Sequence, residues 1–216
     1  YMMGEARNKR VNDIFQLNGN VYAFDSTTID LCLKLFPWAK FRKYKGGIKV
    51  HTLYDVETQV PAFIHITEAK VNDVKAMDSI SYESGSYYVF DRAYNDYKRL
   101  FKIHMKDSFF VVRAKTNIKS RVLKWKRRLP KNILSDCEIE LTGYYSQKAY
   151  PERIRMVRYW DEDDQREFIY LTNAKQISAL QVAELYKNRW QVELFFKWLK
   201  QHLKIKKFWG TSENAV

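Results

Sequence analysis

Two short apolar runs, each followed directly by an aspartate, constrain the fold of this chain most. Residues 21–24 (VYAF) lead into Asp25, and residues 87–90 (YYVF) lead into Asp91. An uninterrupted apolar run of this length, bounded by polar residues, is typical of a strand buried on both faces of a sheet. The sequence therefore predicts a layered domain in which two central strands each end on a carboxylate.

The segments around these runs alternate between strand and helix patterns. Further strands are predicted over 46–55, 60–69 and 108–115, with a turn at 55–59, and helix-compatible segments over 71–80 and 94–106. The first two of these strands are predicted to pair with each other. The resulting order of strand, two strands, helix, strand, helix, strand indicates an α/β domain with a mixed sheet.

Residues 116–175 interrupt this order. Three segments there alternate polar and apolar positions, as antiparallel strands do: EIELTGYY, RIRMVRYW and EFIYLTN, with DEDDQ as a hairpin turn before the last. We interpret this region as a β-rich insertion. The predicted organisation is a lead-in segment (1–19), the first part of the core (20–115), the insertion (116–175) and the rest of the core (176–216).

A helix is predicted from an N-cap at Ser178 to about Gln201. On a helix that turns about 100° per residue, one polar stripe collects Tyr186, Arg189, Glu193 and Lys200 within roughly 60°. A broader apolar face adjoins it, formed by Leu185, Val192, Phe195, Phe196 and Leu199. A carboxylate between cations on an anchored helix suits a metal ligand that faces a polyanion.

The composition favours a polyanionic partner. The 216 residues include 38 Lys and Arg against 25 Asp and Glu, a formal net charge of +13, and 46% are hydrophobic, which excludes wholesale disorder. Nucleic acid is the first candidate and an anionic membrane surface the second, while a generally basic protein without such a partner is the alternative. The two cysteines, Cys32 and Cys137, form no close-spaced pair, so neither a disulfide framework nor a thiolate zinc site is expected.

No apolar stretch approaches the length of a membrane span, and the first residues lack the apolar region of a signal peptide. We expect an intracellular protein. The first residue is not Met and the last residues are polar, which suggests a fragment of a longer chain.

Three carboxylates are candidate metal ligands, each with an ordinary alternative. Asp25 and Asp91 are also typical of caps and turns, and Glu193 of a surface ion pair with Arg189 or Lys197. Two strand-borne carboxylates and one from a helix are, however, the donor set that converges on two hard cations around a phosphodiester.

Four typed positions give the pattern Y-x2-R-x3-E-x6-K, from Tyr186 to Lys200. With this pattern the chain resembles the DDE transposases of the IS4 group of bacterial insertion sequences. The resemblance extends over FDSTTIDL (24–31), KGGIKVHTLYD (45–55), ITEAKVNDVKAM (66–77) and VFDRAY (89–94). Asp91 and Glu193 are 102 positions apart, which suits the members of the group that carry an insertion.

The resemblance implies an RNase H-like mixed sheet flanked by helices, interrupted by the β-rich insertion before the last catalytic helix. It implies that Asp25, Asp91 and Glu193 are the catalytic triad and hold two Mg²⁺ ions, for which Mn²⁺ can substitute. Side chains that would contact DNA are Tyr186, Arg189, Lys200, Arg92 and Tyr94. The alternatives are a core aromatic for Tyr186 and solvated charges for Arg189 and Lys200.

A basic segment within the insertion is a further candidate for DNA binding. Seven Lys or Arg lie between Lys119 and Lys131, around Trp125. The predicted DNA contacts in it are Lys124, Lys126, Arg127 and Arg128, with the aromatic ring able to stack on an unpaired base. A merely solvated basic hairpin is the alternative.

The leading hypothesis is a Mg²⁺-dependent DNA transposase that cleaves the terminal inverted repeats of a transposon and joins them to target DNA. The resemblance implies a homodimer acting in the bacterial cytoplasm, at the nucleoid, with no membrane partner. Two alternatives stay open: an RNase H-like nuclease without strand transfer, and an inactive DNA-binding remnant of a transposase.

Overall fold

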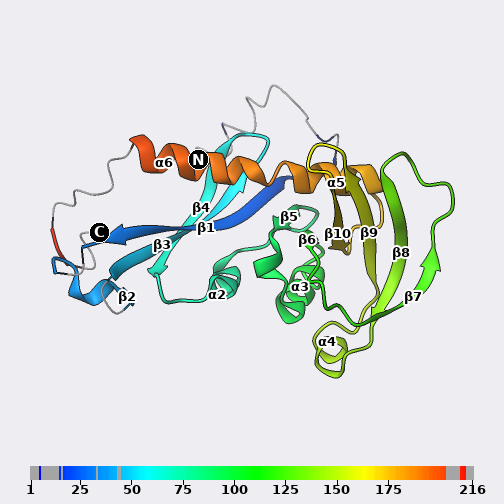
Figure 1. Ribbon diagram of the computed structural model, residues 1–216, viewed down its shortest axis with the longest axis horizontal. Helices are drawn as coiled ribbons and strands as arrows, with labels where there is room; N and C mark the ends of the chain where they lie inside the picture. Colours follow the sequence, from blue (N-terminus) through cyan, green and yellow to red (C-terminus); the bar gives the residue numbers. More distant parts are fainter. Residues whose placement is uncertain are drawn as a thin grey trace.

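Figure 1 presents the computed structural model of the chain, which describes residues 5, 15, 17–32, 34–42, 45–202 and 210–212. Most of the predicted lead-in segment therefore lies outside the described residues. Ten strands within the described part form one sheet in the order β2-β3-β1-β5-β6-β10-β9-β8-β7, with β4 paired to β3. The mixed sheet with its helices confirms the predicted α/β class.

The first half of the sheet is RNase H-like. β1 (Val21–Leu31), β3 (Lys45–Asp55) and β4 (Val60–Glu68) are antiparallel neighbours, as predicted. On the other side of β1, β5 (Tyr87–Phe90) and then β6 (Phe109–Arg113) run parallel to it. The order β4-β3-β1-β5-β6, three antiparallel strands followed by two parallel ones, is that of the predicted fold.

Short elements connect these strands. They are η1 (Pro37–Ala39), β2 (Lys40–Arg42), α2 (Asp73–Ala76), η2 (Met77–Ser79), η3 (Arg92–Tyr94) and α3 (Tyr97–His104). The two helical segments predicted from the sequence correspond to α2 with η2 and to α3. Among the described residues, no helix combines the length and the apolar character that crossing a membrane requires.

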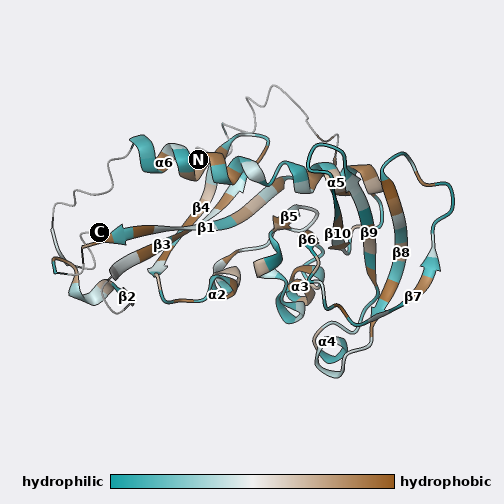
Figure 2. Ribbon diagram, in the orientation of Figure 1, coloured by the Kyte–Doolittle hydropathy of each residue, from teal (hydrophilic) through white to brown (hydrophobic). Residues whose placement is uncertain are grey.

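The β-rich segment extends the same sheet. It contains β7 (Ser120–Trp125), β8 (Ile133–Leu141), β9 (Ile154–Asp161) and β10 (Arg166–Thr172), all antiparallel to their neighbours. β10 pairs antiparallel with β6, so the added strands continue the core sheet without a break. This confirms a β-rich interruption before the last helices, while the exact domain boundaries remain a prediction. Figure 2 shows hydrophobic and hydrophilic residues alternating along β8, and from Cys137 onward buried positions alternate with partly buried ones.

One predicted strand in this region ends early. The segment EIELTGYY leaves β8 after Leu141, and the chain then forms α4 (Tyr144–Ala149). Gly143 precedes this helix in an extended conformation, and its carbonyl accepts a hydrogen bond from the Ser146 hydroxyl at 2.9 Å. The two tyrosines that begin the helix, 144 and 145, are 75% and 84% exposed, so no partner strand covers them.

The last predicted helix is broken into two. α5 (Ala179–Lys187) and α6 (Trp190–His202) follow each other along the top of the sheet in Figure 1. The predicted N-cap is confirmed, since Ser178 and Gln181 form a reciprocal capping box. At the break the Asn188 side chain donates to the Glu184 carbonyl at 3.0 Å. The backbone bonds there span three residues instead of four, as from Arg189 N to Tyr186 O at 3.1 Å, which ends the regular α-helix.

The two larger of the three apolar clusters among the described residues lie on opposite faces of the sheet, and the alternation of side chains along β1 separates them. Val21 and Ala23 face the core beneath α5 and α6, whereas Tyr22 and Phe24 face the core beneath α3. The same alternation directs Asp25 toward α5 and α6, which brings it to the helices that carry the predicted polar stripe.

Candidate active site

Asp25 and Asp91 lie side by side at the end of the parallel pairing of β1 with β5. The last parallel pair is Phe24 with Phe90, and the next residue of the chain after each is one of the aspartates. The prediction that Asp25 ends its strand is wrong, because β1 continues to Leu31. Beyond Phe24, however, β1 keeps β3 as its neighbour and loses β5. The aspartates therefore mark the end of the pairing and not of both strands.

A single guanidinium connects two of the three predicted catalytic carboxylates. Arg189, at the break between α5 and α6, donates to Asp25 Oδ2 at 2.9 Å and to Glu193 Oε1 at 2.5 Å. The Arg189 side chain is 14% exposed and that of Glu193 is 55% exposed. Arg189 is thus largely buried between a strand-borne and a helix-borne carboxylate, so the alternative of a solvated helix charge does not describe it.

Tyr186 holds the third carboxylate. Its hydroxyl donates to Asp91 Oδ1 at 3.2 Å, and its ring packs against Tyr170 at 4.7 Å between centroids. The Arg189 guanidinium lies 5.7 Å from the same ring. Burial and the Asp91 charge raise the pKa of the Tyr186 hydroxyl, which keeps it protonated as a donor. Tyr186 is thus a core aromatic with a polar tip in the site.

The electrostatics of the site centre on Asp25. Burial raises the pKa of its carboxyl to about 6, against the opposing effects of the Ser26 N–H, which donates to Asp25 Oδ1 at 2.8 Å, and of Arg189. The charges of Glu193 and Asp91 raise it as well. Several carboxylates close together in a low-dielectric site favour a cation among them.

The described residues contain no group of three His, Cys, Asp or Glu side chains placed closely enough to hold a metal ion. The guanidinium of Arg189 lies between Asp25 and Glu193, so these two carboxylates do not converge on one point. The donor set itself, carboxylate oxygens from two adjacent strands and a helix, is the kind that binds Mg²⁺. In this conformation a guanidinium supplies the positive charge that such a set attracts.

The other predicted residues of the core differ in accessibility. Lys200 is exposed on α6, about 10 Å along the helix axis from Glu193. Arg92 is exposed in η3, directly after Asp91. Tyr94 is only 1% exposed, and its ring packs edge-on against Phe24 at 5.3 Å between centroids. We therefore do not propose Tyr94 as a DNA contact, because a core side chain at this position has no surface to offer.

The predicted basic contacts of the insertion lie far from the carboxylates. Lys124, Lys126, Arg127 and Arg128 are all exposed, at the end of β7 and in the turn after it. Lys126 forms an ion pair with Asp136 at 3.1 Å. Six strand spacings separate β7 from β1, or roughly 30 Å along the sheet. The basic residues at the end of β7 and those of the core, Arg92 and Lys200, can thus contact different parts of a long ligand. They cannot share one phosphate group.

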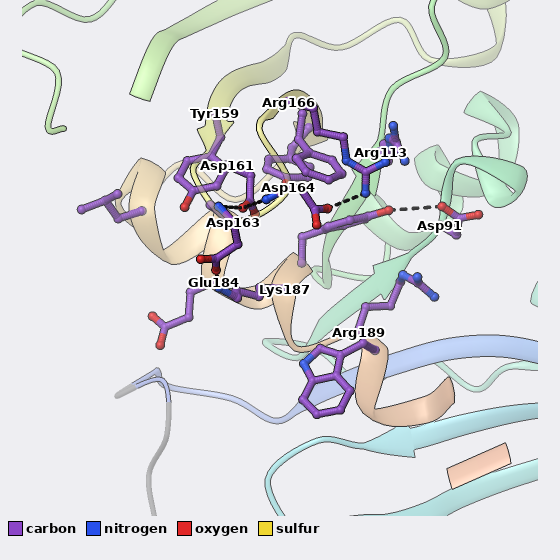
Figure 3. A pocket seen from close by; sticks show the side chains of 16 residues that line it. Asp91, Arg113, Tyr159, Asp161, Asp163, Asp164, Arg166, Glu184, Lys187 and Arg189 are labelled. Atoms are coloured by element: carbon purple, nitrogen blue, oxygen red, sulfur yellow. Dashed lines mark hydrogen bonds and ion pairs between the residues drawn. The ribbon is translucent and has the colours of Figure 1, made fainter. Parts of the chain in front are cut away.

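Sequence reasoning missed a cavity that opens beside the carboxylates. It has a volume of about 640 Å³ and lies between the β9–β10 hairpin, α5 and the start of α6 (Figure 3). The Arg113 and Arg166 guanidinium groups lie 4.8 and 4.4 Å from the Phe168 ring centroid. Asp91 and Arg189 belong to the same lining. The alternation predicted for residues 167–173 places Phe168 and Tyr170 on one face, but nothing local to that segment indicates what lies opposite.

The RNase H-like sheet, with two adjacent carboxylates and a third on a facing helix, places this chain in the DDE class that its sequence resembles. The chain belongs to the transposase DDE domain family, whose model matches residues 17–216.

Named relatives agree with this family. y4zB of Sinorhizobium fredii (strain NBRC 101917 / NGR234), which bears the name of a transposase, is 37% identical over 198 residues, covering 89% of this chain and 54% of that protein. The named transposase of insertion sequence element IS5377 from Geobacillus stearothermophilus is 32% identical over 194 residues, covering 89% and 51%. The chain therefore spans about half the length of these relatives. A piggyBac transposase synaptic complex with hairpin DNA matches 83% of this chain and 40% of its own, with a TM-score of 0.47 and 11% identity.

Proposed function

We propose that this chain is the catalytic part of a DNA transposase that cleaves phosphodiester bonds at transposon ends and joins the ends to target DNA. The observation that carries the proposal is the set of hydrogen bonds made by Arg189 and Tyr186. These two residues, one turn apart, contact all three predicted catalytic carboxylates. Membership of the transposase DDE domain family supports the same reaction.

Asp25, Asp91 and Glu193 would hold divalent cations, with Mg²⁺ as the physiological ion and Mn²⁺ as its substitute. When bound, such ions activate an oxygen nucleophile and stabilise the leaving oxygen of a phosphodiester. Asp25 on β1 and Asp91 directly after β5 lie side by side, which gives the site a rigid base. Tyr186 keeps Asp91 in place through its hydroxyl, since its ring is anchored in the core.

Arg189 would have two sets of partners. Its guanidinium neutralises Asp25 and Glu193 in the metal-free protein. Cations on the same carboxylates would make that charge redundant, so the planar fork of Arg189 would turn to a DNA phosphate. Arg92, exposed directly after Asp91, and Lys200, exposed about two turns along α6 from Glu193, would add contacts to the phosphate backbone.

Double-stranded DNA of the terminal inverted repeats is the proposed partner, with target DNA as the second. The net charge of +13 and the exposed basic residues at the end of β7 support a polyanion longer than the site itself. We propose that the full-length protein acts as a homodimer on paired ends, in the bacterial cytoplasm at the nucleoid.

The test is a nicking assay with the full-length protein on cognate terminal-repeat DNA, with Mg²⁺, Mn²⁺ or EDTA. We expect Asp25→Asn, Asp91→Asn and Glu193→Gln to lose metal-dependent nicking. Asp30→Asn is the matched control, because Asp30 is an exposed carboxylate on the same strand as Asp25. Wild-type nicking rates in all three variants would show that the triad is misassigned.

A second substrate separates the alternatives. Terminal DNA that already carries a free 3′-hydroxyl should be joined to target DNA by a transposase. Nicking without any joined product would identify a nuclease, and DNA binding without either reaction would identify an inactive remnant.

A further inference from the structure

A polar cluster lies on the face of the sheet opposite the catalytic carboxylates, directly behind Asp25. It consists of Ser26 from β1, Lys49 and His51 from β3, Thr67 from β4 and Asp73 at the start of α2. Side chains alternate along β1, so Asp25 faces α5 and α6 while Ser26 faces α2. Ser26 is paired across the strands with His51, which places both side chains on this second face.

Hydrogen bonds connect the cluster to the catalytic carboxylate. The Ser26 backbone N–H donates to Asp25 Oδ1 at 2.8 Å, and the Ser26 hydroxyl donates to Asp73 Oδ1 at 2.7 Å. One residue thus contacts Asp25 on one face of the sheet and Asp73 on the other.

Asp73 is itself held by a cation from β3. Lys49 Nζ lies 3.1 Å from Asp73 Oδ1 and donates to the Val71 carbonyl at 2.7 Å. Lys49 therefore fixes both the Asp73 carboxylate and the loop before α2. The Lys49 side chain is only 14% exposed, so the pair is partly protected from water.

His51 closes the cluster toward β4. Its ring is fully buried, with Nε2 2.9 Å from the Thr67 hydroxyl and Nδ1 4.0 Å from Asp73 Oδ1. The preceding positions on this face of β1, Tyr22 and Phe24, are apolar. Burying polar groups beside them costs free energy, and the Ser26–Asp73 hydrogen bond together with the Lys49–Asp73 ion pair is a means of fixing one geometry.

The location of the cluster matters because β1 loses a neighbour there. Up to Phe24 the strand is held by β3 and by β5, and from Asp25 onward it has β3 alone. The hydrogen bond between Ser26 and Asp73 supplies a constraint one residue after Asp25, where β1 is no longer paired with β5. The metal-ligating position would otherwise lie at the start of a strand segment with one free edge.

We infer that Asp73, held by Lys49, is a positioning residue that fixes the orientation of the Asp25 carboxylate through Ser26. This inference rests on the proposed function, in which Asp25 is a metal ligand. Residues that orient a ligand without contacting the metal typically change metal affinity by about 10- to 100-fold when they are replaced.

The first test is a calorimetric Mn²⁺ titration of the full-length protein without DNA. We expect Ser26→Ala and Asp73→Ala each to weaken Mn²⁺ binding by about tenfold, and Ser26→Thr, which restores a hydroxyl, to bind as the wild type does. Asp73→Asn is a milder second variant in case Asp73→Ala fails to fold. Thr28→Ala is the matched control, since Thr28 lies two residues further along the same face of β1.

Wild-type affinity in folded Ser26→Ala and Asp73→Ala would overturn the inference, and so would an equal loss in Thr28→Ala. Asp25→Asn in the same titration separates this failure from that of the proposed function. If Asp25→Asn also binds Mn²⁺ normally, Asp25 is not a ligand and the proposed site is wrong.

A second measurement tests positioning without any metal. The ¹³Cγ resonance of Asp25 in the metal-free protein should shift in Asp73→Asn and stay in place in Thr28→Ala. An unchanged resonance in Asp73→Asn would contradict the inference whether or not the wild type binds Mn²⁺.

Discussion

Arg189 and Asp25, 164 positions apart in the chain, are joined by a hydrogen-bonded ion pair of 2.9 Å between α5–α6 and β1. The same guanidinium donates to Glu193. A cation from the chain therefore lies among carboxylates that the proposed reaction assigns to metal ions. Protein cation and metal cation would compete for the same oxygens, which makes the affinity for metal sensitive to this arginine.

Arg189→Gln should bind Mn²⁺ more tightly than the wild type in the absence of DNA. The Coulomb energy of a unit charge pair at 4 Å is about 4 kcal/mol at an effective dielectric constant of 20. If removing the arginine strengthens Mn²⁺ binding by a third of this energy, the affinity rises about tenfold. Isothermal titration measures the change. Lys200→Gln, on the same side of α6 but exposed, is the control and should bind Mn²⁺ as the wild type does. Equal or weaker binding by Arg189→Gln would count against the competition.

Neutralising the basic end of β7 should reduce both the affinity for DNA and its dependence on salt. A variant with Gln at Lys124, Lys126, Arg127 and Arg128 is expected to lower the slope of log K against log salt by about one for each DNA phosphate that these side chains neutralise in the wild type. Fluorescence anisotropy across a range of salt concentrations gives the slope.

The control for this variant has the same change in net charge. It carries Gln at four exposed lysines on or beside α2, α3 and α4, namely Lys75, Lys98, Lys106 and Lys148. An identical fall in slope for both variants would mean that total charge, and not the end of β7, determines DNA binding.

Removing a buried arginine in the β-rich segment should destabilise the protein strongly. Arg155 on β9 makes two bonds to Asp136, of 2.8 and 2.7 Å, and donates to the carbonyls of Ala174 and Ile177, just before α5. Arg155→Ala leaves the buried Asp136 without this partner, so we expect the free energy of unfolding to fall by about 3–5 kcal/mol. Urea denaturation measures it.

The matched control is an arginine on the same strand in a partly exposed ion pair. Arg158 pairs with Glu167, and their side chains are 43% and 28% exposed. Arg158→Ala should cost about 1 kcal/mol or less. Similar losses for Arg155 and Arg158 would contradict the structural role assigned to the buried pair.

His51 should make stability depend on pH. Burial lowers the pKa of its imidazole to about 4 from 6.5, with the charge of Asp73 opposing the shift. The unfolded chain binds a proton below pH 6.5 and the folded protein only near pH 4. The stabilisation is therefore fully present above pH 6.5 and is lost as the pH falls through this window, by about 3 kcal/mol in total.

Comparison of wild type and His51→Gln by urea denaturation between pH 4 and 7.5 isolates this contribution. The difference in unfolding free energy between the two proteins should shrink as the pH falls. His202→Gln, at an exposed position at the end of α6, is the control for the loss of one histidine. A constant difference for His51→Gln would show that His51 titrates normally in the folded protein.

Local patterns were sufficient to predict the main parts of the fold. The apolar runs before Asp25 and Asp91 identified two neighbouring strands, and helical periodicity placed Tyr186, Arg189 and Glu193 on one side. These signals are local, because each depends on the spacing of side chains within one element.

Features that depend on tertiary pairing were not predictable in this way. That β1 runs on past Asp25 follows from its pairing with β3, a contact between two separate segments of the chain. Tyr94 looked accessible beside Asp91, but packing against Phe24 buries it. The ion pair between Arg189 and Asp25 depends on where α5 ends, and the backbone and side-chain bonds of residues 188–189 set that end.

The pairing of β10 with β6 limits how this chain can be shortened. Deleting the whole β-rich segment would strip the edge of β6 and remove the strands whose loop leads into α5, so the arginine and tyrosine that contact the carboxylates would lose their support. A shorter functional chain would have to lack the outermost strands first, β7 and then β8. The β-rich segment can therefore be shortened only from its outer edge. The β9–β10 hairpin is needed because it supports the residues that hold the carboxylates.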